Sequence, residues 1–180
     1  PEVKAQLMLR YRINAAGEVA VTQQMTTDKE AKVADLFRYG MQLQMPAAYS
    51  KLEYYGRGPE ENYIDRHASA FIGKYESNVK DEYYSYIRPQ ESGNHTDIRY
   101  FSIFNPTSGK GITFEAFGEM ECSAIPYLVE DLDAGDEKNH SWGQHSGDLV
   151  DKGLVQLHIQ QRQYGLGCID SWMTKPMEKY

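Results

Sequence analysis

Apolar and polar residues alternate along much of this chain, starting within its first twenty residues. The apolar positions fall on one face of two extended segments joined by a turn at residues 15–18: Leu7, Leu9, Tyr11 and Ile13, then Val19 and Val21. A period of two residues is that of a β-strand, and turn residues between two such runs indicate a hairpin. The pattern therefore predicts a β-hairpin at the start of the chain.

Strand-like patterns continue downstream, with turn residues between most of them. The expected strands are Leu36 to Leu43, Lys51 to Tyr55, Tyr83 to Ile87, Asp97 to Asn105, Gly111 to Phe117 and Leu154 to Arg162. A weak helical signal at Pro126 to Leu132 ends at Gly135, and a polar loop, Asp131 to Lys152, precedes the last strand. Short strands at this spacing are typical of a β-sandwich. We predict one all-β domain covering residues 1–180.

Length, charge and the start of the chain limit its partners. The 180 residues are 41% hydrophobic and 25% charged, which is enough for one buried core. A formal net charge of −7 argues against binding to nucleic acid or to an anionic membrane. The chain begins Pro-Glu-Val-Lys, without an initiator Met, and enters a strand pattern at once. We expect a segment of a longer protein, which leaves open whether targeting signals and the first sandwich strands lie outside it.

The cysteines and histidines lack the spacing of a metal or redox site. Cys122 and Cys168 are the only cysteines, which favours two buried thiols and leaves a disulfide between them open. The five histidines are His67, His95, His140, His145 and His158. Their spacing matches no zinc motif, and the acidic residues near His140 do not follow the calcium-loop pattern. We predict no dedicated metal site and no cofactor in this segment.

A glycine-rich turn follows the expected strand at Lys51 to Tyr55. In Gly56-Arg-Gly-Pro59 the glycines permit unusual backbone conformations and the proline fixes one dihedral angle, so the chain can turn sharply. Several charged and amide side chains come with it: Arg57, Glu60, Glu61, Asn62, Asp65 and Arg66. The planar Arg66 guanidinium matches a carboxylate, so we expect a charge-assisted network. A structural role is favoured over ligand binding, which stays open.

Pairs of carboxylates are the usual apparatus of glycoside hydrolysis. This chain offers Glu60 with Glu61, Asp131 with Asp133, and Asp136 with Glu137. Adjacent acids on a strand point to opposite faces, and acids in loops are usually solvated, so none of these pairs has the arrangement of an acid and its partner. Catalysis from within these residues is not expected.

Trp172 closes a second glycine-rich stretch, Tyr164-Gly-Leu-Gly-Cys-Ile-Asp-Ser-Trp172. A tryptophan in such a turn offers a flat apolar face on which a sugar ring can stack, and Asp170 and Ser171 can fix its direction by bonding the local backbone. The alternative is a tryptophan that caps the core or sits at an interface. We predict a carbohydrate contact at Trp172.

Three stretches occur in the same order in one known family: Tyr55-Gly-Arg-Gly-Pro-Glu-Glu-Asn-Tyr-Ile-Asp-Arg66, Arg88-Pro-Gln-Glu-Ser-Gly-Asn94, and Gly165-Leu-Gly-Cys-Ile-Asp-Ser-Trp172. In these motifs the chain resembles the C-terminal domain of glycoside hydrolase family 2 β-galactosidases. The resemblance runs from about Leu36 to Trp172. It departs from the family at Cys168-Ile169, where many relatives carry Gly-Asp.

The resemblance implies an antiparallel β-supersandwich similar to the galactose mutarotase-like fold, at the end of a large bacterial enzyme. The parent would be a retaining hydrolase of terminal β-galactosides, cytoplasmic or periplasmic, with its catalytic glutamates in a separate TIM barrel and any Mg or Na site outside this domain. Trp172 matches the tryptophan that reaches the active site, supported by Asp170 and Ser171. The matching loop residues imply a supporting scaffold: Arg57, Glu61, Asn62, Tyr63, Asp65 and Arg66. Expected partners are the β-galactoside, the barrel and a second copy of the chain.

Three other functions remain open at this point. A free-standing carbohydrate-binding module would use the same indole and bind galactosides by itself, whereas a domain sharing its site would bind feebly alone. A mutarotase-like epimerase would need an acid and a base in one cleft, such as His95 or His158 with a glutamate. A purely structural or oligomerising domain would bury Trp172 and the tyrosines in an interface. If the first strands are missing, an exposed edge can pair two copies.

Overall fold

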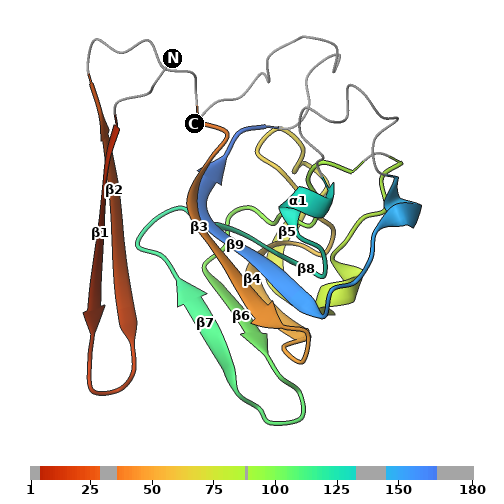
Figure 1. The fold of residues 1–180 in the computed structure, drawn as a ribbon, viewed down its shortest axis with the longest axis horizontal. Coiled ribbons are helices and arrows are strands. Elements are labelled where there is room, and N and C mark those ends of the chain that lie inside the picture. The colour runs from red at the N-terminus through yellow and green to blue at the C-terminus, as the bar shows by residue number, and fades with distance from the viewer. Residues whose placement is uncertain (1–4, 29–35, 88, 133–144, 166–180) are drawn as a thin grey trace. The chain divides into compact units, whose positions relative to one another are not determined.

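The computed structural model of the chain describes residues 5–28, 36–87, 89–132 and 145–165. Two compact units emerge, residues 1–36 and residues 37–180, and each is treated by itself (Figure 1). Nearly all regular structure in the described part is antiparallel β-strand, with a single four-residue α-helix. This confirms the prediction of an all-β, antiparallel fold.

The first unit is the predicted hairpin. β1 (Ala5–Ile13) pairs with β2 (Val19–Thr27) so that Leu7 lies opposite Met25 and Tyr11 opposite Val21. In the connecting turn, the Asn14 side chain accepts bonds from the amides of Ala16 and Glu18, both at 3.0 Å. Nothing within the hairpin covers its apolar face. A two-stranded hairpin is marginal on its own, so this face depends on packing that the hairpin itself does not supply.

The second unit is built on two antiparallel sheets. The three-stranded sheet has the order β3-β9-β8 and comprises β3 (Arg38–Pro46), β9 (Leu154–Gln163) and β8 (Glu121–Ile125). The four-stranded sheet has the order β5-β4-β6-β7 and comprises β5 (Phe71–Asn78), β4 (Lys51–Gly58), β6 (Tyr100–Phe104) and β7 (Gly111–Glu115). The short helices are η1 (Val79–Asp81), α1 (Val129–Leu132) and η3 (Ser146–Asp148).

One hydrophobic cluster joins the two sheets into a sandwich. The four-stranded sheet contributes Leu52, Tyr54, Phe101 and Ile103, and the three-stranded sheet contributes Met45, Cys122, Ala124, Val155, Leu157 and Ile159. Each fully buried aliphatic side chain stabilises the fold by roughly 1.5–3 kcal/mol. Cys122 is a free, buried thiol whose pKa burial raises, as predicted for that residue, whereas Cys168 lies outside the described residues.

Sequence patterning misplaced part of the four-stranded sheet. The expected strand at Tyr83 to Ile87 is irregular chain, because the Tyr84 amide donates to the Ser92 hydroxyl at 2.8 Å and not to a neighbouring strand. The pattern missed β5 and β8. β8 is buried along its whole length, so its polar residues Glu121 and Ser123 do not mark a face that meets water. The expected helix shrinks to α1, and its end at Gly135 lies outside the described residues.

The backbones of β3 and β9 approach each other closely at Gly40. The register of the two strands shifts between Tyr39 and Gly40, where a Cβ on Gly40 would overlap the backbone of Gln160. Only a residue without a side chain permits this approach. β9 is thus held in the middle of its sheet, between β3 and β8, and its C-terminal end carries the chain toward the second glycine-rich motif.

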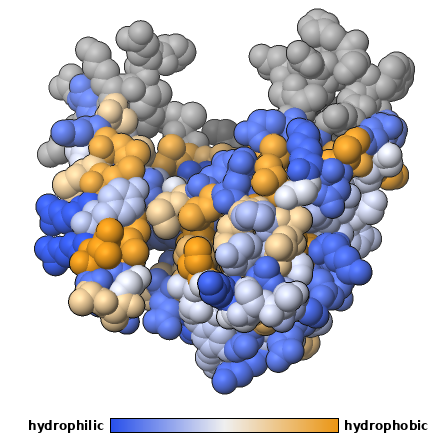
Figure 2. Space-filling view, turned by 60° about the horizontal axis from the view of Figure 1, so that its bottom comes forward, coloured by the Kyte–Doolittle hydropathy of each residue, from blue (hydrophilic) through white to orange (hydrophobic). Residues whose placement is uncertain are grey.

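On the face drawn in Figure 2, hydrophobic side chains gather in small clusters between hydrophilic ones. Several of the exposed apolar side chains in the second unit are aromatic or β-branched: Phe71, Ile72, Tyr84, Ile87, Ile112 and Phe117. Within the described residues, no helix has both the length and the apolar character needed to cross a bilayer.

Candidate functional site: a buried polar network around the Gly56–Arg66 loop

The loop that carries the first motif begins later than its glycines suggested. β4 runs through Gly56 and Arg57 to Gly58, and the chain turns at a cis peptide bond between Gly58 and Pro59. A Cβ on Gly58 would meet the ring of Tyr75 at 2.9 Å, so the strand end packs tightly against the core. The expected sharp turn is present, but three residues of the motif, Gly56 to Gly58, belong to the strand before it.

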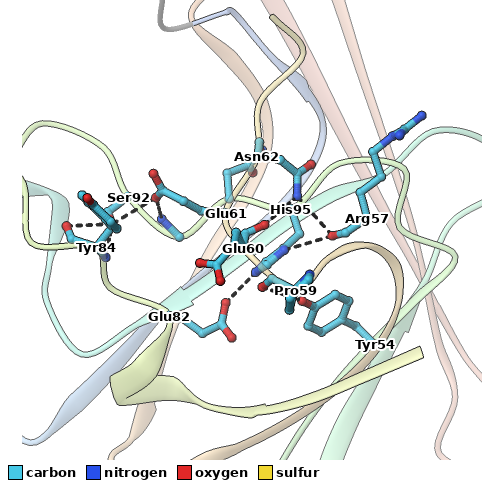
Figure 3. Close-up of polar contacts among 12 residues, drawn as sticks. Tyr54, Arg57, Pro59, Glu60, Glu61, Asn62, Glu82, Tyr84, Ser92 and His95 are labelled. Carbon is cyan, nitrogen blue, oxygen red and sulfur yellow. Dashed lines mark hydrogen bonds and ion pairs between the residues drawn. The ribbon is translucent and has the colours of Figure 1, made fainter. Parts of the chain in front are cut away.

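Asn62 anchors this loop from within. Its Nδ2 donates to the backbone carbonyls of Arg57 at 3.1 Å and Glu60 at 3.0 Å. Its Oδ1 accepts from Thr96, from the amide at 3.0 Å and from the hydroxyl at 2.6 Å. The side chain is buried, and the four bonds fill the capacity of the amide. Asn62 therefore ties the loop to itself and to the segment before β6. Figure 3 shows its side chain directed toward the Arg57 carbonyl.

Glu61 turns inward beside it and collects donors on both carboxylate oxygens. Oε1 accepts from the Arg66 guanidinium at 2.6 Å and from the Tyr86 hydroxyl. Oε2 accepts from the Gly93 amide at 2.6 Å and from the Ser92 hydroxyl at 3.2 Å. The Tyr63 hydroxyl adds a longer bond at 3.3 Å. The Glu61 side chain is 8% exposed, so a buried carboxylate joins the loop to residues 84–93.

The two arginines of the motif have different partners. The Arg57 side chain bonds the Asp97 carboxylate at 2.5 Å and the Ala70 carbonyl at 3.0 Å, both outside the loop. Arg66 pairs with Glu61 inside the loop and lies over the Tyr63 ring, 5.0 Å from its centroid. Backbone bonds in both directions between Tyr63 and Arg66 close the turn that contains Asp65. The predicted carboxylate partner of Arg66 is confirmed.

His95 and Glu82 form a buried pair below the loop (Figure 3). His95 Nδ1 lies 3.1 Å from the Arg57 carbonyl, which can only accept, so Nδ1 carries a proton. Nε2 lies 2.5 Å from the Glu82 carboxylate. Their side chains are 1% and 6% exposed. His95 therefore connects the end of β4, through the Arg57 carbonyl, with Glu82, the residue that caps η1.

A second polar layer lies on β8 and β9. Gln156 Nε2, which can only donate, lies 3.2 Å from His158 Nε2, so His158 Nδ1 carries the proton and donates to the Ser123 hydroxyl at 3.1 Å. Burial, with a smaller effect of Arg38, lowers the pKa of His158 to about 3. His158 is thus a neutral, hydrogen-bonded histidine, and because it is buried its ring is not solvated.

Two further carboxylates are buried nearby, and one of them, Glu121, connects this layer to the loop. Glu121 accepts from Asn94 Nδ2 at 3.1 Å, and Asn94 in turn donates to the Asn62 carbonyl at 3.0 Å. Burial raises the pKa of Glu121 to about 7, against the opposing effect of that Asn94 bond. Glu91 forms an ion pair with Arg38. Burial also raises the pKa of Glu91, and Arg38 counteracts it.

The structure brings together the loop residues predicted as scaffold and adds others. Asn62, Glu61, Tyr63 and Arg66 meet in one network, and Arg57 joins it through its carbonyl. Trp172, Asp170 and Ser171 lie outside the described residues, so their roles stay predictions. The partners that sequence reasoning did not assign are Glu82, Tyr86, Thr96 and Glu121, and the Glu91-Ser-Gly-Asn94 motif was the one signal that pointed to this region.

These groups are engaged with one another, and this limits their chemistry. His95 and Glu82 are buried, as are Glu121 and His158, so the described acids and bases of the network face neighbouring side chains and not open solvent. The described residues also contain no group of three or more side chains placed to hold a metal ion. Such an arrangement rigidifies a loop and fixes its exit points.

Comparison with known proteins gives a consistent result over the full length of the chain. Residues 1–180 match the family model described as "Beta galactosidase small chain". The β-galactosidase of Priestia megaterium is 32% identical over 176 residues, covering 98% of this chain and 16% of that protein. The β-galactosidase of Lactobacillus delbrueckii subsp. bulgaricus is 31% identical over 174 residues, covering 96% of this chain and 16% of that protein. The chain thus spans about a sixth of the length of these curated relatives.

Proposed function

Since the chain belongs to the β-galactosidase small-chain family, we propose that it is a domain of a β-galactosidase that hydrolyses terminal β-galactosides. In this proposal the parent's catalytic glutamates lie in another domain, and this domain supplies a scaffold and one sugar contact, Trp172. One observation carries the proposal: nearly the whole chain aligns with about a sixth of the length of each relative, and these relatives are named β-galactosidase.

The buried network supports a contributing role over a catalytic one. A general acid or base must reach the proton that it transfers, in a cleft that admits the substrate. His95 and His158, the residues that an epimerase would use, are 0% and 3% exposed and bonded to fixed partners. An accessory domain can still accelerate hydrolysis by orienting the sugar at a site that another domain completes.

The experiment is Trp172→Ala in the full-length parent enzyme, assayed with a β-galactoside. We expect kcat/KM to fall about tenfold or more, with the melting temperature nearly unchanged, because the indole would supply contact area and no proton transfer. Trp142→Ala is the matched control, since Trp142 is the other tryptophan of the chain and lies outside the glycine-rich motif. Unchanged kinetics together with a large fall in melting temperature would overturn the proposal.

An autonomous carbohydrate-binding module is separated from this proposal by titration. Tryptophan fluorescence of the isolated chain would be followed as galactose or lactose is added. Saturable quenching at about millimolar sugar, absent in Trp172→Ala, would establish a self-sufficient binding site. We expect no saturable response, because most contacts to the sugar would come from other domains.

An interface role is the second candidate, and the apolar face of the β1–β2 hairpin favours it. Ile13 is 74% exposed and Tyr11 58%. Exposed apolar faces of this kind mark contacts with other protein surfaces. Tyr11→Glu in the full-length parent would lower the mass measured by analytical ultracentrifugation if this face joins two subunits, and would leave it unchanged otherwise.

A further inference from the structure

β5 (Phe71–Asn78) forms one edge of the four-stranded sheet in the second unit. It pairs with β4 over its whole length and without a register shift, and no strand of the described part of the chain lies on its other side. Val79 directly follows β5 and donates its amide to the Ser50 carbonyl at 3.0 Å. Hydrogen-bonded and non-hydrogen-bonded pairs alternate in an antiparallel ladder. The residues that turn their backbone N–H and C=O groups away from β4 are therefore Ile72, Lys74, Glu76 and Asn78.

The other edges of the two sheets carry features that hinder pairing, and β5 lacks those features. β3 has a register shift at Gly40 and ends at Pro46, and β7 and β8 have five residues each. β5 has eight residues, with no register shift and no proline. It also exposes apolar surface, since Phe71 is 71% and Ile72 41% exposed. A long, regular and partly apolar edge is a template for another strand.

Lys74 and Glu76 carry opposite charges on the solvent face of this edge. Both residues are exposed, and neither forms an ion pair within the described residues. Glu76 lies directly opposite Glu53 of β4, in a non-hydrogen-bonded pair, where side chains are closest. Like charges in this position destabilise a sheet. The Tyr100 hydroxyl donates to Glu53 at 2.8 Å, but no described group compensates the charge of Glu76.

A second copy of the chain supplies the missing opposite charges. A two-fold axis through Tyr75, perpendicular to the sheet, sets β5 antiparallel to β5 of the second copy. Lys74 then lies opposite Glu76 of the second copy, and Glu76 lies opposite Lys74 of the second copy. Ile72 lies opposite Asn78 in the same way. Each residue whose backbone groups point outward thus meets another such residue, and each of these pairs can exchange two backbone hydrogen bonds.

No other register of β5 against itself does this. Directly opposite residues of an antiparallel pair lie on the same face of the sheet, so the axis has to pass through a residue and not between two. An axis through Lys74 sets lysine against lysine, and an axis through Glu76 sets glutamate against glutamate, which destabilises the pair. Axes nearer either end of the strand shorten the ladder. Only the register centred on Tyr75 combines charge complementarity with nearly the full length of β5.

We propose that the β5 edge joins two copies of this chain, by antiparallel pairing centred on Tyr75 that makes the two four-stranded sheets continuous. The interface goes beyond the proposed function, since it requires neither a sugar nor Trp172. One strand per copy buries little surface compared with a standard interface, so the association is reversible, with a Kd on the order of 10 μM. Each exposed ion pair contributes modestly, so the charges mainly select the register.

The test reverses the two charges one at a time and then together in the full-length parent enzyme. Lys74→Glu and Glu76→Lys each place like charges opposite one another at both symmetry-related positions, whereas the double variant restores opposite charges. An equimolar mixture of the two single variants also restores them, because one copy then carries two acids at these positions and the other carries two bases. Lys110→Glu and Glu115→Lys are the matched controls, since both residues are exposed and lie at the two ends of β7 in the same sheet.

Sedimentation equilibrium at about 50 mM salt measures Kd, since higher salt screens exposed charges. We expect each single variant to raise Kd about ten- to a hundredfold, because two attractive pairs become two repulsive ones. The double variant and the mixture should return to within about threefold of wild type, and the two controls should not differ from it. Hydrogen exchange in peptides covering residues 71–78 should slow as the wild-type enzyme associates, and it should stay fast in each single variant at the same concentration.

The opposite outcomes overturn the interface. If the mass and the exchange of the wild-type enzyme equal those of the single variants at every concentration, β5 does not pair with itself. Slow exchange throughout would then mean that another segment of the parent covers this edge, and fast exchange throughout that Lys74 and Glu76 keep it free. Single variants that dissociate but are rescued neither by mixing nor by the double change would also refute charge pairing about Tyr75. Failure of the proposed function is seen separately, in the kinetics of Trp172→Ala.

Discussion

Glu61→Gln tests whether the carboxylate of Glu61 organises the loop as an acceptor on both of its oxygens. Each oxygen faces one donor that can never accept: Arg66 on Oε1 at 2.6 Å, and the Gly93 amide on Oε2 at 2.6 Å. Hydroxyl donors such as Tyr86 can rotate to become acceptors, but these two cannot. A glutamine has one oxygen and one NH2 group, so in either orientation its NH2 group meets an obligate donor.

The magnitude follows from which donor is left without a partner. If the NH2 group faces the buried Gly93 amide, the unpaired N–H costs about 1–3 kcal/mol. If the NH2 group faces Arg66, whose side chain is 54% exposed, the guanidinium can move into water, and leaving it unpaired costs less than about 1 kcal/mol. The charge-assisted bond to the buried carboxylate is lost in addition. We expect Glu61→Gln to lower the free energy of unfolding by about 1–3 kcal/mol.

Urea unfolding of the 180-residue chain measures this effect, with melting temperature as a second readout. A loss of about 2 kcal/mol corresponds to a fall of about 4–8 °C for a chain of this size. Glu60→Gln is the matched control, because Glu60 is the adjacent acid and is exposed. A Glu61→Gln variant as stable as wild type, or a Glu60→Gln variant equally destabilised, would refute the acceptor argument.

Two further predictions concern buried polar groups. Burial raises the pKa of Glu121 from 4.5 to about 7, so the folded state prefers the protonated acid and loses stability as pH rises from about 4.5 to 7. Glu121→Gln should flatten this dependence in urea titrations and be more stable than wild type at about pH 8, by about 1–3 kcal/mol; a dependence that survives in the variant would contradict the assignment. Asn62→Asp should lower the free energy of unfolding by about 3–5 kcal/mol, because a carboxylate oxygen would face the carbonyls of Arg57 and Glu60. Asn105→Asp is the control, measured like Asn62→Asp by thermal unfolding. It should leave stability nearly unchanged, because the Asn105 side chain accepts through its oxygen from the amides of Thr107 and Ser108, and a carboxylate can accept in the same way. Equal losses of stability in both variants would show that the position of the hydrogen-bond donor does not set the effect.

Local chemistry accounts for what the sequence predicted well. The β1–β2 hairpin follows from strict alternation around Asn14 and Gly17, where the Asn14 side chain and a glycine at φ +85° satisfy the turn. The core face of β9 follows from Val155, Leu157 and Ile159 in the same way. These elements are encoded within about ten residues of sequence, which is the range that periodicity can detect.

Contacts between distant segments account for what it missed. Three partners of Glu61, namely Tyr86, Ser92 and Gly93, lie 25 to 32 positions away. The Glu82 that pairs with His95 lies 13 positions before it, in a segment to which the pattern assigned no role. β8 escaped detection because the polar layer of Glu121 and Ser123 is buried, so polarity there does not mark the solvent face. Burial of polar groups is decided by partners, and a single sequence does not show who the partners are.

The different environments of Glu60 and Glu61 explain why a charged motif in this domain need not be catalytic. Glu60 is exposed, whereas Glu61 is buried against obligate donors. A carboxylate held by that many donors is stabilised in place and has no free lone pair aimed at a substrate. What such a group can do is hold a backbone still, and the backbone that it holds includes Asp65, which touches the point where the chain leaves β9. Under the proposed function, the value of the acidic motif would then lie in geometry: it would hold the turn that contains Asp65 in place, while proton transfer would take place on another domain.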